Sequence, residues 1–216
     1  TQFYRSIIQA VPSTITCVYS NCPSRTGNKL MLNTNTPFAK AIFELFTQLE
    51  ELIQTQTNEP GACRAYLFGG CAVHIHTNAR GSSDVDVELE AMKKGLKLDE
   101  LVLKLDPVFY DDPEAGQEVL YYDETFNPTL APLHEDYQQD AIPLEIRNNS
   151  PLWVYVVTKA DPAVSKLGRF GEQDILDIHT LFDHGLEVES FRKRAEAAIR
   201  YAVGNETELI GRMNHV

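Results

Sequence analysis

The chain has 216 residues, of which 43% are hydrophobic and 23% charged, so it can bury a sizeable core in one generous domain or two small ones. Its 19 lysine and arginine residues and 31 aspartate and glutamate residues leave a formal net charge of −12 at pH 7, which disfavours a broad surface for coating DNA or RNA. No apolar run approaches the ~18 residues that span a bilayer, which excludes an integral membrane protein.

The first 35 residues carry the weakest pattern. Residues 13–20 alternate loosely between apolar and polar side chains, which favours a strand, and residues 21–35 are typical of a polar loop. The chain does not begin with the basic-then-apolar pattern of a signal peptide, and its four cysteines form no C-x-x-C pair. We therefore expect a cytoplasmic protein with reduced cysteines.

A long amphipathic helix is predicted over residues 37–56. Thr36 supplies a capping hydroxyl, and Pro37 stands at the first helical position, where proline is favoured. The apolar side chains that follow recur every three or four positions, as on the buried face of a helix: Phe38, Ala41, Ile42, Leu45, Phe46, Leu49, Leu52 and Ile53.

The next segment combines short strands with glycines. A buried strand over residues 65–68 runs into Gly69 and Gly70, and a brief helix is predicted over residues 71–76. Residues 84–89 then alternate strictly between acidic and apolar side chains, which predicts one half-buried strand with an acidic face.

Shorter patterns complete the predicted fold. A helix is expected over residues 96–105, a turn at Asp111-Asp112, a loop over residues 123–139, and strands over residues 119–122, 142–146 and 153–157. Asp161-Pro162 repeats the combination of a capping residue and a proline that starts a helix. Two apolar stripes that follow it predict further helices. We expect an α/β fold: a mixed sheet flanked by helices over residues 1–160, with a C-terminal helical part, residues 161–216, packed on it as a single domain.

Two glycines and two carboxylates form the pattern with the clearest chemistry. Gly69 and Gly70 lack side chains, so a phosphate group can approach the backbone closely. Asp84 and Asp86, two positions apart on a strand, project to the same side and suit divalent cations, which prefer oxygen ligands. Cations held there could bridge the phosphates of a nucleotide and neutralise charge on leaving pyrophosphate. The alternative interpretation is a solvated strand whose acids only add charge.

A second group of charges lies in the C-terminal part. Two cations and then two acids are each spaced by about one helical turn: Lys166, Arg169, Asp174 and Asp177. Taken alone, this pattern favours solvated helix faces joined by salt bridges.

Together the two groups resemble the nucleotidyltransferase superfamily, in particular its minimal bacterial members of the abortive-infection and toxin type. The superfamily's first motif matches Phe68-Gly69-Gly70 followed by Asp84-Val85-Asp86-Val87, with glycine where many active members have serine. The arginine and small hydroxyl residue that often precede the first aspartate match Arg80 and Ser82. The later motif matches Lys166, Arg169, Asp174 and Asp177, and the resemblance covers roughly residues 64–182.

The resemblance implies a reaction and a set of roles. The protein would move a nucleoside monophosphate from a nucleoside triphosphate to a hydroxyl of a tRNA end, a protein or a small molecule, and an antitoxin would be its partner. Asp84 and Asp86 would ligate Mg²⁺ or Mn²⁺, and Gly69 and Gly70 would line the triphosphate. The remaining nucleotide-binding residues would be Arg80, Ser82, Lys166, Arg169 and Asp174.

A third catalytic carboxylate is not marked by any motif. Asp123, directly after the strand predicted over residues 119–122, is the first choice, Glu145 the second and Glu88 the third. If none of them serves, the protein would be a non-catalytic nucleotide-binding or regulatory module on the same fold.

Three reactive side chains near the glycines are not interpreted as site residues: His74 and His76 are expected to be packing or surface residues, and Cys71 a packing residue. His74 and His76 lie two apart on a predicted helix and so point in different directions, which prevents them from sharing a metal ion. Cys71 has no evident partner base that would activate it as a nucleophile.

Overall fold

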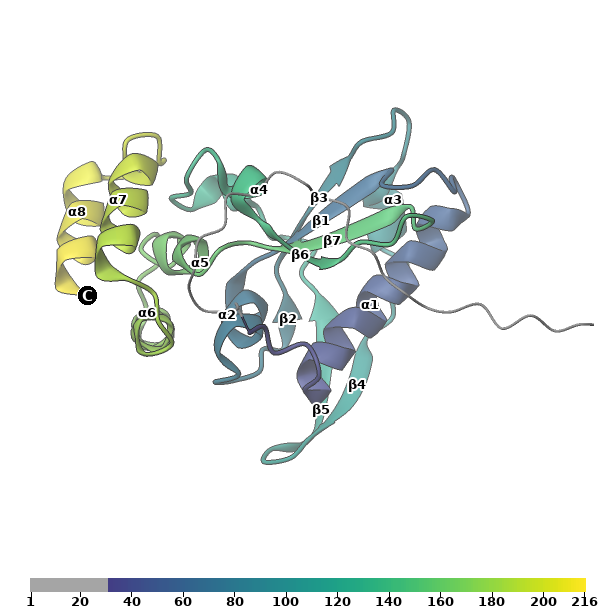
Figure 1. Cartoon of the computed structure of the whole chain (residues 1–216), viewed down its shortest axis with the longest axis horizontal. Helices are drawn as coiled ribbons and strands as arrows, with labels where there is room; N and C mark the ends of the chain where they lie inside the picture. The colour runs from purple at the N-terminus through teal and green to yellow at the C-terminus, as the bar shows by residue number, and fades with distance from the viewer. Residues whose placement is uncertain (1–30) are drawn as a thin grey trace, which may run out of the picture. The chain divides into compact units, whose positions relative to one another are not determined.

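A computed structural model describes residues 31–216 of the chain (Figure 1). The first two-thirds of these residues contain two β-sheets. The strand expected over residues 13–20 and most of the loop expected over residues 21–35 lie outside the described residues. Residues 31–216 form one compact unit. Its mixed α/β structure with a C-terminal helical region confirms the predicted fold class. The division into parts at residue 160 stays a prediction.

The larger sheet has four strands in the order β3-β1-β7-β6. Its strands are β1 (Cys63–Leu67), β3 (Val87–Ala91), β6 (Ile142–Glu145) and β7 (Leu152–Val156). Strand β1 runs parallel to β7 and antiparallel to β3, and β6 pairs antiparallel with β7. The central strands β1 and β7 are mostly apolar and buried, as expected for strands covered on both faces.

The smaller sheet has three strands in the order β2-β5-β4, with β2 (Asp84–Val85), β4 (Val108–Asp112) and β5 (Gly116–Tyr122). Strand β4 is not predicted from the sequence, and β5 begins three residues before the predicted strand. The turn expected at Asp111-Asp112 is wrong, because both residues lie in β4 and pair with β5. The turn follows them, and the Asp112 carboxylate caps it by accepting from the N–H groups of Glu114 and Ala115.

The single strand predicted over residues 84–89 is split at Asp86. On one side, the carbonyl of Val85 accepts from the N–H of Asp123, next to β5. On the other side, β3 pairs with β1, and the carbonyl of Asp86 itself accepts from the N–H of Phe68 at 2.8 Å. Because its two halves pair with different sheets, the alternating segment links the two sheets at Asp86.

Helix α1 (Pro37–Gln54) confirms the predicted cap and apolar stripe and ends two residues early. Thr36 Oγ1 accepts from the N–H of Ala39 at 3.0 Å. The buried face of α1 packs into the core that the two sheets share. Helix α2 (Gly69–Thr77) begins two residues before the predicted helix, and α3 (Leu98–Val102) is shorter than predicted. The loop expected over residues 123–139 contains the short helix η1 (Pro128–Leu130) and the start of α4 (Tyr137–Asp140).

Four helices form the C-terminal region: α5 (Ala160–Ser165), α6 (Glu172–Asp183), α7 (Val188–Ile199) and α8 (Glu206–His215). Helix α8 is not predicted from the sequence. The predicted cap at Asp161 is wrong, because α5 already includes Ala160; the Asp161 carboxylate instead accepts from the N–H and hydroxyl of Thr158.

Helix α2 joins the two halves of the described chain. Its residues Cys71 and Ile75 belong to the core beneath the sheets, whereas Val73 belongs to a second core formed by the C-terminal helices. Helices α5 and α6 contact α2 directly, and Figure 1 shows the four C-terminal helices gathered beyond it. Among residues 31–216, no helix combines the length and apolar character needed to cross a membrane.

Candidate active site

The start of α2 makes a close backbone approach to an aspartate. Gly69 has a φ of +56°, a conformation that L-residues with a side chain rarely adopt. A Cβ built on Gly69 would lie 1.6 Å from Asp86 Oδ2, so no larger side chain fits while Asp86 keeps its position. The preceding residue, Phe68, provides no side-chain cap, which leaves the first N–H groups of α2 open to an anion.

Three carboxylates converge next to this helix start. Asp84, Asp86 and Asp123 offer oxygen atoms that all lie within 4.8 Å of one another. Asp84 pairs with Tyr121 across β2 and β5, and Asp123 follows two residues later, so the parallel pairing brings both side chains to one end of the sheet. The Asp123 carboxylate is held there because its Oδ1 accepts from the N–H and hydroxyl of Thr125.

These carboxylates fit a divalent cation. Burial, helped by the neighbouring charges of Asp84 and Asp123, raises the pKa of Asp86 to about 6, although Lys166 and Arg169 oppose this shift. The site thus concentrates negative charge that a bound Mg²⁺ or Mn²⁺ would neutralise, and carboxylate oxygens are the donors that such hard cations prefer.

This raised pKa predicts an unusual pH dependence. The folded, metal-free protein binds a proton at Asp86 more tightly than the unfolded chain does, so this group favours the folded state at low pH and loses that contribution as pH rises through 6. Between pH 5 and pH 7 in EDTA, the loss is about 1 kcal/mol of unfolding free energy. Denaturant unfolding at both pH values should show this loss in the wild type, whereas Asp86→Asn should lack it. An equal pH dependence in both proteins would contradict the assignment.

The two other candidates for the third carboxylate lie elsewhere. Glu88 accepts hydrogen bonds from the hydroxyl of Tyr137 and the amide of Gln138. Glu145 forms an ion pair with Arg147 at 3.3 Å. The structure therefore brings Asp123, and neither alternative, together with Asp84 and Asp86.

Two predicted nucleotide-binding residues border the glycines. A Cβ on Gly70 would lie 3.0 Å from Ser82 Oγ and 3.1 Å from Arg80 Nη2, so both side chains adjoin the first turn of α2. The Ser82 hydroxyl donates to Asp84 Oδ1 at 2.7 Å, which orients one of the three carboxylates.

The C-terminal charges form an ion-pair network with Arg80, in which Lys166 and the two carboxylates are buried and Arg169 is exposed. Arg80 and Lys166 form ion pairs with Asp177, and Lys166 and Arg169 form ion pairs with Asp174. These five residues are called the ion-pair network below. Asp174 and Asp177 are only 1% and 2% exposed, so the predicted solvated helix faces are wrong. Burial raises the pKa of Asp174, but the hydrogen bond from Arg169 and the charge of Lys166 outweigh it and lower the pKa to about 2.

One cleft of about 940 Å³ joins these groups. Gly70, Asp84, Asp86 and Asp123 line it together with the cations Arg80, Lys166 and Arg169. The β4–β5 hairpin also lines the cleft. Of its two strands, β4 is not predicted from the sequence, because its residues show no clear apolar–polar alternation. The hairpin residues lining the cleft are Tyr110, Asp112, Pro113, Glu114, Ala115 and Glu118.

The histidines and cysteine of α2 are packing residues, as predicted. His74 contacts Thr36 Oγ1 and the carbonyl of Arg80 through its two ring nitrogens, whereas His76 contacts the carbonyl of Val157. Burial lowers the pKa of both histidines, to about 4 for His76. Cys71 is buried, and burial raises its thiol pKa well above the ordinary value, which opposes a role as a nucleophile.

Comparison with known proteins agrees with this site. The model of a family described as nucleotidyltransferase of unknown function (DUF6036) matches residues 40–211. A search of curated proteins finds no match to the chain. The matched range includes both glycines, the three carboxylates and the ion-pair network, and it confirms the resemblance to nucleotidyltransferases. The chain therefore belongs to this nucleotidyltransferase family of unknown function.

Proposed function

We propose that the protein transfers a nucleoside monophosphate from a nucleoside triphosphate to an acceptor hydroxyl, with Mg²⁺ or Mn²⁺ as cofactor. The observation that carries this proposal is the convergence of Asp84, Asp86 and Asp123 within 4.8 Å, beside the open start of α2. Family membership supports the reaction class. A cytoplasmic location, expected from the sequence, is kept as part of this proposal.

Each group of residues has a distinct task in this proposal. Asp84, Asp86 and Asp123 would hold the metal ions, which supply Lewis acidity and neutralise charge on the phosphates. The backbone at Gly69 and Gly70 would bind the triphosphate at the positive end of α2. Lys166 and Arg169 line the cleft and would donate charge-assisted hydrogen bonds to phosphate oxygens.

The local charges also explain how so acidic a chain could bind a nucleotide. The net charge of −12 is spread over the whole sequence, whereas three cations meet at one side of the cleft. Once metal ions neutralise Asp84, Asp86 and Asp123, these cations would attract a compact triphosphate, while the rest of the surface would stay unfavourable to a long polyanion. A tRNA end, a protein hydroxyl and a small molecule all remain as acceptors to be tested.

The direct test is transfer of label from each of the four nucleoside triphosphates, in Mg²⁺ or Mn²⁺, to tRNA, protein and small-molecule acceptors. We expect incorporation from at least one triphosphate that EDTA abolishes. If no acceptor is labelled but calorimetry detects metal-dependent nucleotide binding, the non-catalytic alternative would replace this proposal. That alternative was based on the lack of a third carboxylate, and the position of Asp123 weakens it.

A toxin role neutralised by an antitoxin is proposed from the resemblance to toxin-type members. Controlled expression in a bacterial host should then arrest growth, and Asp84→Ala should relieve the arrest at an equal protein level. Normal growth with abundant, active wild-type protein would exclude the toxin role and leave the transferase proposal intact.

A further inference from the structure

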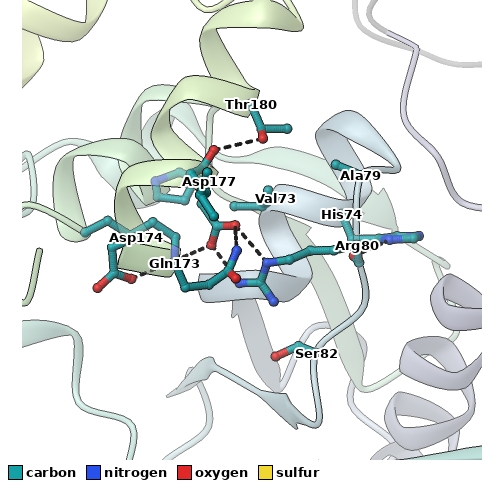
Figure 2. Close-up of polar contacts among 12 residues, drawn as sticks. Val73, His74, Ala79, Arg80, Ser82, Gln173, Asp174, Asp177 and Thr180 are labelled. Carbon is teal, nitrogen blue, oxygen red and sulfur yellow. Dashed lines mark hydrogen bonds and ion pairs between the residues drawn. The ribbon is translucent and has the colours of Figure 1, made fainter. Parts of the chain in front are cut away.

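Asp177 of α6 reaches across to the loop that follows α2. Its two carboxylate oxygens accept from Arg80 Nε at 2.7 Å and Arg80 Nη2 at 2.6 Å, a bidentate pair between residues 97 positions apart (Figure 2). The Gln173 amide donates to the same carboxylate at 2.9 Å. Burial raises the pKa of Asp177, but the hydrogen bonds from Arg80 and Lys166 outweigh it and lower the pKa, so the group is charged.

This pairing fixes the direction of the Arg80 guanidinium. Arg80 Nη1 also donates to the carbonyl of Gly81 at 2.7 Å, so residues 31–216 engage three of the five guanidinium N–H groups. Nη2 lies 3.1 Å from the position of a Cβ on Gly70, at the open start of α2. The remaining N–H groups of Nη1 and Nη2 are left for a ligand in the cleft.

The same carboxylate also holds Lys166. Lys166 Nζ lies 2.7 Å from Asp177 Oδ2 and 3.2 Å from Asp174 Oδ1, and the side chain is 7% exposed. Arg80 and Lys166 carry like charges and repel each other, so Asp177 between them allows both to lie at one side of the cleft. Its contacts in the described structure are to these cations and Gln173, and Asp177 itself does not line the cleft.

We infer that Asp177 is a positioning residue of the nucleotide site, holding Arg80 and Lys166 in the geometry that receives the triphosphate without touching it. This inference rests on the proposed function. It makes helix α6 part of the site, although all three metal-binding candidates lie in the sheet region. Preset side chains lose less entropy on binding, and a misplaced cation would weaken the contact to phosphate.

The chain offers a matched control for a purely structural ion pair. Asp161 is 0% exposed and accepts from Arg194 Nε, which ties α5 to α7. Neither Asp161 nor Arg194 lines the cleft. Asp161→Asn therefore makes the same chemical change in a similarly buried carboxylate that pairs with an arginine, away from the cleft.

The test measures binding of a non-hydrolysable ATP analogue, or of the analogue of whichever triphosphate is the substrate, in Mg²⁺ by calorimetry. We expect Asp177→Asn to weaken binding roughly 10–100-fold, as loss of such supporting contacts does elsewhere, and Asp161→Asn to leave it within twofold. Mg²⁺ binding without nucleotide should stay close to that of the wild type in both variants, because neither residue lines the cleft or forms a hydrogen bond or ion pair with the three carboxylates. Equal binding by the wild type and Asp177→Asn would overturn the inference and leave the proposed function standing.

A double-mutant cycle tests whether Asp177 acts through Arg80. If it does, the double variant Asp177→Asn with Arg80→Gln should bind the nucleotide only slightly more weakly than Arg80→Gln alone. The remaining difference would be the loss of affinity that comes from releasing Lys166. Fully additive losses would show that Asp177 does not act through Arg80 and would overturn that part of the inference. NMR of the Arg80 Nε–H adds a ligand-free measure: slow solvent exchange in the wild type should be lost in Asp177→Asn.

If Asp177→Asn does not fold, a substitution of the exposed neighbour Gln173 tests the same inference. Gln173→Ala removes one donor to Asp177 and keeps every charge, and roughly threefold weaker nucleotide binding is expected. Unchanged binding would then overturn the inference. If the wild type binds no nucleotide at all, the proposed function fails and the inference fails with it.

Discussion

Asp86→Asn is expected to reduce kcat/KM for nucleotidyl transfer roughly a thousandfold, equivalent to about 4 kcal/mol of transition-state stabilisation. Asp86 is one of the three converging carboxylates, and the chain passes from one sheet to the other at this residue. Asparagine keeps the size of the side chain but removes the charge that a divalent cation needs. Initial rates over a range of Mg²⁺ and nucleotide concentrations measure the loss, and weaker Mg²⁺ binding should accompany it.

Asp111→Asn is the matched control for this substitution. Asp111 is an exposed residue of β4 and does not line the cleft, so the variant has the same change in net charge without touching the site. Its activity should stay within twofold of the wild type. An Asp86→Asn enzyme that retains most of its activity would remove the metal role from Asp86, and an equal loss in both variants would point to net charge as the cause.

Gly69→Ala is expected to lower both stability and activity. The φ of +56° at Gly69 costs an alanine roughly 1–2 kcal/mol. The larger effect is steric, because the new Cβ would lie 1.6 Å from Asp86 Oδ2 and either the carboxylate or the helix start must move. Activity should therefore fall by a factor approaching that of Asp86→Asn. Denaturant unfolding and the transfer assay, run on the same preparation, measure the two effects.

Gly95→Ala is the control that separates the effect of backbone strain from the effect of the steric clash with Asp86. Gly95 also has a positive φ, +88°, but a Cβ there would meet nothing within 4 Å. This variant should lose stability to a similar backbone cost and keep full activity. Wild-type activity in Gly69→Ala would mean that close approach of α2 to Asp86 is unnecessary for the reaction.

The family assignment and the local geometry support each other at different levels. The match over residues 40–211 establishes the family, and the description of that family leaves its substrate open. The three cations that line the cleft form ion pairs with carboxylates of α6. The proposed triphosphate site is therefore built partly from this C-terminal helix. Activity on any acceptor should therefore depend on the C-terminal helices as well as on the sheet.

The sequence by itself determined the elements whose patterns are local. Helix α1 follows from a capping threonine, a proline and an apolar stripe, all within 20 residues. The candidate site likewise follows from short spacings: two glycines after a strand, and Asp84 and Asp86 two positions apart. The position of Asp123 directly after a predicted strand makes it the first choice for the third carboxylate.

Only the tertiary structure decided which distant groups meet. The alternation over residues 84–89 would look the same if the segment paired within one sheet or with two sheets. In the structure, β2 pairs with β5 and β3 pairs with β1, so the segment is divided between two sheets at Asp86. Arg80 and Asp177 lie 97 residues apart, so no local period relates them. Spacing therefore indicated that Asp174 and Asp177 share a helix face, whereas their burial against Arg80 and Lys166 depends on how α6 packs beside α2.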